Sequence, residues 1–311
     1  MNYPDFFSSR NSLSLFGFSD HFNFLSNLYL KNNLPKVILF TGNKGSGKST
    51  LVNHFLYSVF DTKNYDIKKN CLDGKSKFLI QFKNDIFSNI IYINGSDFKT
   101  VKIDDIRDLK TKISQSSILN KERFIILDDI ELFNQNTLNA LLKIIEEPTS
   151  KNYFFLINNK SKHLIETIKS RALEINIILN ESQRLKIIDN LTRTFNLDLV
   201  LDPLTAQLSP GNFVKFNYIF KEFNISPLND FMENLSLLIN LHKKNKDMIF
   251  VNLAYFVADF HFDYLRKKKI LQSERIYEVK NFIFDNLNKY MLYNINQNSL
   301  LNAINSKLNY E

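Results

Sequence analysis

The chain has 311 residues, of which 44% are apolar and 23% charged, and a formal net charge of +8. This is the composition of a globular protein with a sizeable core and room for two or three domains. The single cysteine, Cys71, excludes an internal disulfide framework and a multi-cysteine metal site. The opening residues lack the apolar core of a signal peptide, and no apolar run approaches the length of a membrane helix. We therefore expect a cytoplasmic protein with no membrane contact.

The first predicted elements enclose a cluster of glycines. Val37–Phe40 is a short apolar run typical of a buried parallel strand, and apolar residues recur at helical spacing over Leu51–Val59. Between them Gly42–Ser49 reads G-N-K-G-S-G-K-S, a P-loop pattern in the strand–loop–helix context that it needs. The alternative is a glycine turn before an ordinary helix.

Each residue type of this loop suits a nucleoside triphosphate. Backbone N–H groups converge on phosphate oxygens, Lys48 reaches the β and γ phosphates, and Ser49 offers its hydroxyl to Mg²⁺. The sequence therefore predicts an ATP–Mg²⁺ site. The predicted nucleotide-binding residues are Gly42, Asn43, Lys44, Gly45, Ser46, Gly47, Lys48, Ser49 and Thr50.

Two acids follow a later predicted strand. After a strand at Ile90–Ile93, the apolar run Phe124–Leu127 predicts another, and Asp128 and Asp129 come directly after it. Ligands of open α/β sheets bind at the carboxyl ends of the strands. We predict that Asp128 binds Mg²⁺ with Ser49, the Walker B role, and that Asp129 orients the attacking water. A pair of exposed acids at a strand end is the alternative.

The pattern then continues to a complete α/β domain. A helix ends at Pro148, strands are predicted at Tyr153–Ile157 and Leu173–Ile177, and a helical stretch at Leu164–Ile168 lies between these strands. Five strands alternating with helices indicate a parallel sheet covered on both faces.

An asparagine pair ends the fourth predicted strand. Asn158 and the adjacent Asn159 come directly after the predicted strand Tyr153–Ile157. A strand-end asparagine commonly serves as a plain turn residue.

The remainder of the chain reads as helical. Asn180–Ser182 has the residues of a helix start, and after Pro227 helical patterns continue to the end. Phe256, Phe260 and Tyr264 recur at helical spacing, and we predict that they form a core stripe of a bundle. The basic cluster Arg266–Lys269 is predicted to be a solvated helix end, with steering of DNA or partner subunits as the alternative.

Three features resemble the clamp-loader branch of the AAA+ ATPases, over about residues 13–178. Asn139–Pro148, N-A-L-L-K-I-I-E-E-P, is similar to the signature that follows the Walker B strand in that branch. Ser170–Ala172 resembles its S-R-C motif with Ala in place of Cys, and Leu15–Gly17 resembles its entry to the P-loop strand. The resemblance implies an α/β AAA+ P-loop domain over 1–178, a small helical lid domain over 179–223, and an all-α collar domain over 224–311.

Within this branch the chain is more similar to the delta prime subunits of bacterial DNA polymerase III than to the motor subunits called gamma or tau. Motor subunits usually have Asp-Glu where this chain has Asp128–Asp129. They also have an arginine three residues after a glycine of the lid, where this chain has Val214 three residues after Gly211. The resemblance implies ATP binding with weak or no hydrolysis. A gamma/tau-like motor ATPase is the alternative. A P-loop kinase or GTPase of another class leaves Asn139–Pro148 unexplained.

The resemblance also implies a shared mechanism and partners. Neighbouring subunits of the branch build one ATP site together, so Arg171 would be an arginine finger acting in trans on a neighbour's γ-phosphate. A surface or intramolecular ion pair is the alternative for Arg171. Asn158 stands at the position of the sensor 1 residue of this branch, so the resemblance implies that Asn158 hydrogen-bonds the γ-phosphate or the attacking water, with Asn159 as the adjacent alternative. The implied partners are gamma/tau and delta subunits in a hetero-pentamer, the sliding clamp, and primed DNA reached through the assembly. The chain would be part of a DNA-directed DNA polymerase holoenzyme.

One departure concerns zinc. Relatives in this branch usually carry a four-cysteine zinc module between the P-loop helix and the second strand, whereas Asp61–Phe87 contains only Cys71. The nearest histidine, His54, lies in the predicted P-loop helix. We therefore expect no zinc and a loop in place of the module.

Overall fold

The computed structural model describes residues 3–96, 103–114, 121–227, 229–269 and 273–309, which form two compact units. An α/β unit contains the described residues of 3–196 together with 208–212. A helical unit contains those of 197–207 and 213–311. The expected division into three domains at 178 and 223 stays a prediction.

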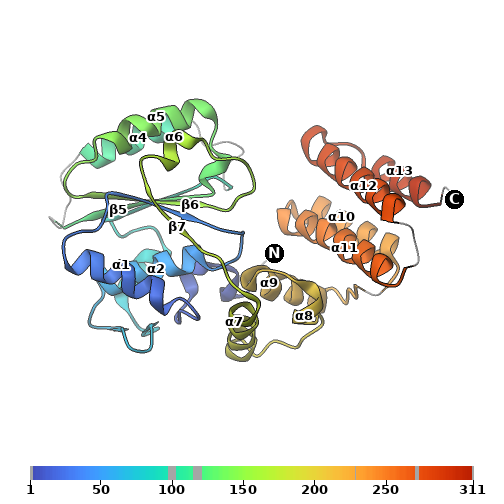
Figure 1. Cartoon of the computed structure of the whole chain (residues 1–311), viewed down its shortest axis with the longest axis horizontal. Coiled ribbons are helices and arrows are strands. Elements are labelled where there is room, and N and C mark those ends of the chain that lie inside the picture. Colours follow the sequence, from blue (N-terminus) through green and yellow to red (C-terminus); the bar gives the residue numbers. More distant parts are fainter. Residues whose placement is uncertain (1–2, 97–102, 115–120, 228, 270–272, 310–311) are drawn as a thin grey trace. The chain divides into compact units, whose positions relative to one another are not determined.

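A five-stranded parallel sheet forms the middle layer of the α/β unit (Figure 1), in the order β4-β5-β6-β1-β7. This confirms the sheet predicted from the sequence. All four strand pairs are parallel. The strands are β1 (Val37–Thr41), β4 (Ile90–Asn94), β5 (Arg123–Asp128), β6 (Asn152–Asn158) and β7 (Leu173–Asn176).

Helices cover both faces of this sheet (Figure 1). Successive strand residues point to opposite faces, so Ile38 and Phe40 enter one hydrophobic core while Val37 and Leu39 enter the other. Because helices cover both faces of the sheet, both sides of each strand are buried and the strands are continuous apolar runs in the sequence. The covering helices are α1 (Ser19–Leu30) and α2 (Lys48–Phe60) on one face, and α4 (Ile103–Ser114), α5 (Gln135–Glu146) and α6 (Glu166–Lys169) on the other.

The segment between α2 and β4 is not the loop that we expected. It forms a short antiparallel pair, β2 (Tyr65–Asp66) with β3 (Cys71–Leu72), and then the helix α3 (Lys77–Lys83). The Ser76 side chain caps α3 by accepting from the Leu79 N–H. Phe78, Leu79 and Phe82 of α3 are buried in the α1–α2 core, and this burial stabilises the helix.

The predicted helix start at Asn180 is confirmed as a capping box. The Asn180 side chain accepts from the Gln183 N–H at 2.8 Å, and the Gln183 side chain accepts from the Asn180 N–H at 3.1 Å. Both bonds satisfy amides at the start of α7 (Glu181–Thr194) that have no partner inside the helix. Asn180→Ala is therefore expected to lower the free energy of unfolding by about 1 kcal/mol, measured by urea titration. An unchanged midpoint would contradict this role for the cap.

The helical unit contains a four-helix arrangement in which α10, α11, α12 and α13 pack in turn and α13 returns to α10. The predicted core stripe of α11 is wrong. Phe256 and Phe260 are half-buried and Tyr264 is 43% exposed. The buried face of α11 instead contains Phe250, Ala254, Val257, Ala258 and Phe262, because the neighbouring helices pack on that side. The helices wholly in this unit are α8 (Pro203–Ala206), α10 (Phe231–Asn245), α11 (Met248–Lys267), α12 (Ser273–Tyr293) and α13 (Gln297–Asn309), whereas α9 (Pro210–Glu222) begins in the residues 208–212 of the α/β unit.

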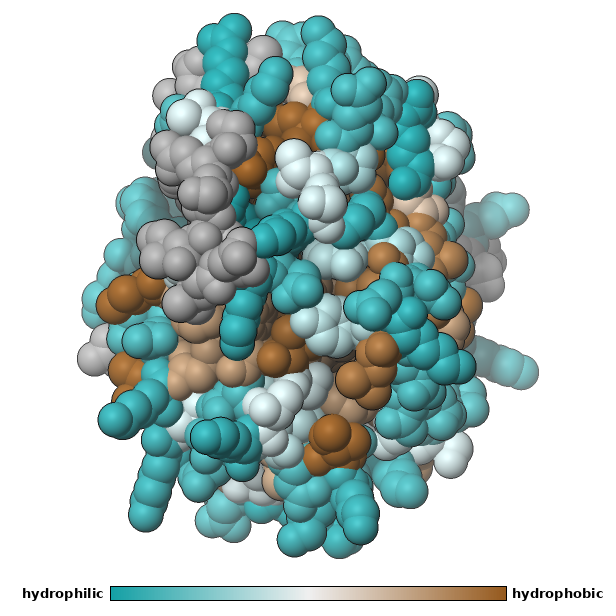
Figure 2. Space-filling view, turned by 90° about the vertical axis from the view of Figure 1, so that its left-hand side faces the viewer, coloured by the Kyte–Doolittle hydropathy of each residue, from teal (hydrophilic) through white to brown (hydrophobic). Residues whose placement is uncertain are grey.

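Among the described residues, no helix has the length and apolarity needed to cross a membrane. The surface in Figure 2 is mostly hydrophilic, with hydrophobic residues in small separate patches. Scattered apolar residues of this kind are normal on a protein surface.

Candidate nucleotide site

The P-loop lies between β1 and α2, at the carboxyl end of the central strands. Gly45 and Gly47 have φ angles of 78° and 102°, in the left-handed region that favours glycine, and Gly47 is the N-cap of α2. The buried Lys48 ammonium donates to the carbonyl oxygens of Gly42 at 2.7 Å and Asn43 at 2.8 Å. The loop thus curls around its own lysine at the N-terminus of a helix, the arrangement that binds phosphate.

Residues from a later segment pack against the same loop. The Ser209 hydroxyl donates to the Lys44 carbonyl at 2.6 Å, and the Gly211 N–H donates to the Gly45 carbonyl at 2.8 Å. A Cβ at Gly45 would lie 2.6 Å from the Ser209 hydroxyl oxygen, so only glycine fits there. These contacts fix the outer part of the P-loop.

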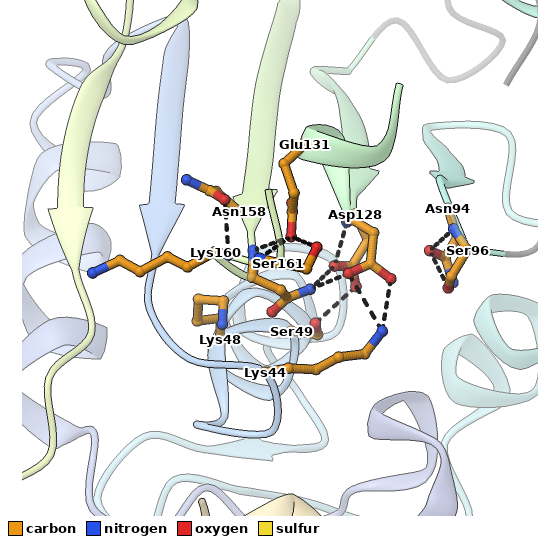
Figure 3. A network of polar contacts seen from close by, with 12 residues as sticks. Lys44, Lys48, Ser49, Asn94, Ser96, Asp128, Glu131, Asn158, Lys160 and Ser161 are labelled. Carbon is orange, nitrogen blue, oxygen red and sulfur yellow. Dashed lines mark hydrogen bonds and ion pairs between the residues drawn. The ribbon is translucent and has the colours of Figure 1, made fainter. Parts of the chain in front are cut away.

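Asp128 and Ser49 are brought together as the sequence predicted. Asp128 Oδ2 accepts from the Ser49 hydroxyl at 2.8 Å and from the Tyr92 hydroxyl at 2.7 Å, as Figure 3 shows for Ser49. Oδ1 accepts from the Asp129 N–H at 2.9 Å. A hydroxyl and a carboxylate at this distance suit Mg²⁺, which takes few protein oxygens and completes its shell with waters and phosphates.

Asp129 is held on both of its oxygens. Its backbone has a φ of 51°, in the left-handed region. Lys44 Nζ lies 3.1 Å from Oδ2, and the Asn159 amide nitrogen lies 2.6 Å from Oδ1. The carboxylate of Asp129 therefore joins the P-loop to the end of β6.

The two asparagines at the end of β6 have different contacts. The Asn158 side-chain oxygen accepts from the Lys160 N–H at 2.9 Å, so Asn158 holds its own turn (Figure 3). Asn159 donates from its amide to Asp129 and also to Asp128 Oδ1, at 3.3 Å. The side chain that faces the acids is that of Asn159, the adjacent residue that the sequence left as the alternative.

Burial and charge shift the titration of this site. Burial lowers the pKa of Lys48 to about 8, against the attraction of Asp128, Glu131 and Asp129. Burial raises the pKa of Asp128, which the Tyr92 and Ser49 hydrogen bonds only partly oppose. Burial also acts to raise the pKa of Asp129, but Lys44 and Asn159 outweigh it and the pKa is lowered.

Sequence reasoning missed two residues of this site. Tyr92, in β4, donates to Asp128, while the Arg10 guanidinium lies 4.1 Å from the centre of the Tyr92 ring. Glu131 is 4% exposed and accepts hydrogen bonds from the turn after β6. Nothing in the sequence around Tyr92 indicates a role in this site. Glu131 could have been considered, because it is an acid only two residues after Asp129.

Arg171 lies after α6 and has its contacts elsewhere. Arg171 Nε and Nη2 approach Glu146 Oε1 at 2.9 Å and 2.7 Å, and Nη1 donates to the Thr167 carbonyl at 3.0 Å. The Arg171 side chain is 36% exposed. Arg171 thus forms the intramolecular ion pair that the sequence left as the alternative, and this pair joins the Ser170–Ala172 and Asn139–Pro148 motifs.

The described residues contain no group of three or more His, Cys, Asp and Glu side chains that could hold a metal ion. Cys71 is a free, partly buried thiol in β3. His54 is buried, and its Nδ1 lies 3.1 Å from the Tyr65 hydroxyl.

Comparison with known proteins places the chain in a family. Residues 18–180, just over half of the chain, match the family described as DNA polymerase III, delta subunit. The chain is 36% identical to DNA polymerase III subunit delta′ of Pseudomonas aeruginosa over 76 residues, 24% of this chain and 23% of the relative. It is 27% identical to the delta′ subunit of Buchnera aphidicola subsp. Schizaphis graminum over 223 residues, 69% and 63% of the two chains.

A motor-type relative matches as well. The chain is 25% identical to DNA polymerase III subunit tau/gamma of Haemophilus influenzae over 167 residues, 51% of this chain and 22% of the relative. The chain spans less than two thirds of the length of each of these three relatives. The family match, which runs from the start of α1 through the P-loop and both acids to the N-cap of α7, means that the chain belongs to the DNA polymerase III delta subunit family.

Proposed function

We propose that the chain is a delta prime-type clamp-loader subunit that binds ATP–Mg²⁺, turns it over slowly or not at all, and gives Arg171 to a neighbouring motor subunit. The loader places a ring-shaped sliding clamp on primed DNA, and this chain acts in it as a stator. The observation that carries the proposal is the exposed Arg171, held by Glu146 and Thr167 rather than by the residues of its own P-loop. An arginine placed this way is available to another subunit.

The geometry of the P-loop supports nucleotide binding. Lys48 Nζ donates to carbonyls of the loop, where it would meet the β and γ phosphates, and Asp128 Oδ2 lies 2.8 Å from the Ser49 hydroxyl. Bound Mg²⁺ would neutralise charge on the β and γ phosphates. Ser49 and Asp128 would hold the ion, and Tyr92 would keep the Asp128 carboxylate oriented.

The contacts of Asp129 support slow hydrolysis. A carboxylate that orients water must direct an oxygen lone pair at that water within hydrogen-bond reach, and other donors on its oxygens compete for those lone pairs. Lys44 and Asn159 contact the two oxygens of Asp129, and aspartate is one methylene shorter than the glutamate usual in motor subunits. The lowered pKa of Asp129 also makes it a weaker base.

The alternative, a gamma/tau-like motor, requires a different set of catalytic residues. The position where motor subunits carry a lid arginine holds Val214, which is 3% exposed. A buried valine has no charge to offer a phosphate. Both Asp129 and Val214 favour the delta prime proposal.

Single-turnover hydrolysis by the isolated chain tests the two proposals. With labelled ATP and Mg²⁺, we expect ATP to stay bound and largely uncleaved over the time in which a motor subunit completes its turnover. The chain is used in excess over ATP, and a sample with EDTA gives the metal-independent background. Rapid cleavage by the lone chain would favour the motor alternative.

The proposed partners follow from the delta prime assignment. They are gamma/tau and delta subunits in a hetero-pentamer, the sliding clamp, and primed DNA through the assembly, in the cytoplasm. We propose the AAA+ domain at 1–178, the lid at 179–223 and the collar at 224–311 as the parts that assemble. Co-purification of the chain with separately tagged gamma/tau and delta subunits tests the assembly.

A further inference from the structure

A buried carboxylate, Glu131, lies beside the nucleotide site without a part in the reaction described above. It is the middle residue of η3 (Ile130–Leu132), the turn that follows the two acids, and it is 4% exposed. Carboxylates are almost never buried to this extent unless they are paired or hydrogen-bonded. The contacts of Glu131 therefore indicate its role.

One oxygen of Glu131 accepts three hydrogen bonds from one turn (Figure 3). The donors to Oε1 are the Asn159 N–H at 3.0 Å, the Ser161 N–H at 3.2 Å and the Ser161 hydroxyl at 2.7 Å. The other oxygen, Oε2, is buried and has no hydrogen-bond partner among the described residues. Glu131 thus ties the turn after β5 to the turn after β6 through Oε1 alone.

The turn that Glu131 holds carries the amide that faces both acids. The Asn159 amide nitrogen lies 2.6 Å from Asp129 Oδ1 and 3.3 Å from Asp128 Oδ1. Lys160, the next residue, has a φ of 58°, a backbone conformation that a residue other than glycine keeps only where its surroundings impose it. The main chain of Asn159 is fixed by Glu131 while its side chain reaches the acids.

We propose that Glu131 is a positioning residue of the nucleotide site, which fixes the 159–161 turn so that the Asn159 amide meets the γ-phosphate of ATP beside Asp128 and Asp129. This inference rests on the proposed binding of ATP. Because ADP has no γ-phosphate, Glu131 affects the affinity for ATP and leaves that for ADP unchanged. The turn is held by hydrogen bonds rather than by the negative charge of Glu131, because all three donors bind to one oxygen, Oε1.

Three variants separate this role from general stability. Glu131→Ala removes the acceptor and leaves two backbone N–H groups of the turn without it. Glu131→Gln removes the charge but keeps one carbonyl oxygen in place of Oε1. Ile130→Ala is the matched control, because Ile130 is fully buried in the same turn but contributes only apolar packing.

The affinities of the full chain for ATP and ADP are measured with Mg²⁺ by titration calorimetry. Glu131→Ala is expected to lower the ATP affinity relative to ADP about tenfold, or about 1.4 kcal/mol. Glu131→Gln and Ile130→Ala are expected to keep the wild-type ratio. Without nucleotide, hydrogen exchange of the 159–161 amides is expected to be faster in Glu131→Ala and unchanged in Glu131→Gln.

The outcomes distinguish a failure of the proposed ATP binding from a failure of the proposed role of Glu131. If the wild-type chain binds no ATP, the proposed function fails and the inference fails with it. If the wild-type chain binds ATP and Glu131→Ala keeps its ATP-to-ADP ratio, the inference alone is overturned. Equal losses in Glu131→Ala and Ile130→Ala, no rescue by Glu131→Gln, or unchanged exchange in Glu131→Ala also overturn it.

Discussion

Arg171→Ala in the assembled loader is expected to remove ATP cleavage at one site. An arginine finger stabilises the charge that develops on the transferred phosphoryl group, and supplied in trans it is worth about 10³–10⁵ in rate. In a single-turnover reaction with labelled ATP, the fast phase should therefore lose the amplitude of one motor site. ATP binding to the isolated chain should be unchanged, because Arg171 contacts Glu146 and Thr167 outside its own P-loop.

Arg193→Ala is the matched control for this experiment. Arg193 is also an exposed arginine of the α/β unit, and it forms an ion pair with Asp189 at 3.0 Å. Its removal deletes a charge of the same kind and should leave all sites active, since exposed ion pairs contribute little. Full fast-phase amplitude in Arg171→Ala would refute the finger.

Lys48→Met is expected to lower the affinity for ATP by about 30-fold or more. Removing one partner of a buried charged contact costs about 2–5 kcal/mol, and every 1.4 kcal/mol is a factor of about ten in affinity. Titration with ATP and Mg²⁺ measures the affinity. The fold should survive, because burial lowers the pKa of Lys48 to about 8, which shows that its charge is costly to bury. A methionine of similar length removes that cost.

Lys63→Met serves as the comparison for Lys48→Met, since Lys63 is exposed in the α/β unit. It makes the same chemical change and should leave ATP affinity as in the wild type. Wild-type affinity in Lys48→Met would mean that the Gly42–Ser49 loop is not the nucleotide site. A large fall in the melting temperature of Lys48→Met would instead indicate a structural role for the lysine.

The sheet, the P-loop and the position of Asp128 were predictable from apolar runs and motif spacing alone. Buried parallel strands need unbroken apolar runs, so β1, β5 and β6 were visible as such. The P-loop was recognisable from the sequence because glycines and a lysine at this fixed spacing, between a strand and a helix, have few other uses. The position of Asp128 followed from the rule that parallel strands bring their carboxyl ends to one edge.

The polar groups that complete the site depend on the packing of distant segments and could not be predicted from the sequence. Asn158 and Asn159 are chemically identical neighbours, and the turn after β6 decides that Asn159 faces the acids while Asn158 bonds to Lys160. Tyr92 donates to Asp128 because β4 and β5 are adjacent in the sheet, although their sequences are about thirty residues apart. Such contacts depend on the packing of segments that have no local relation in the chain.

The same reason accounts for the errors outside the site. The spacing of Phe256, Phe260 and Tyr264 gives one helical stripe, but α11 has apolar residues on several sides, and packing against α10 and α12 decided which side is buried. Periodicity and motif spacing are local properties of the chain, whereas burial and hydrogen-bond partners are set by distant segments.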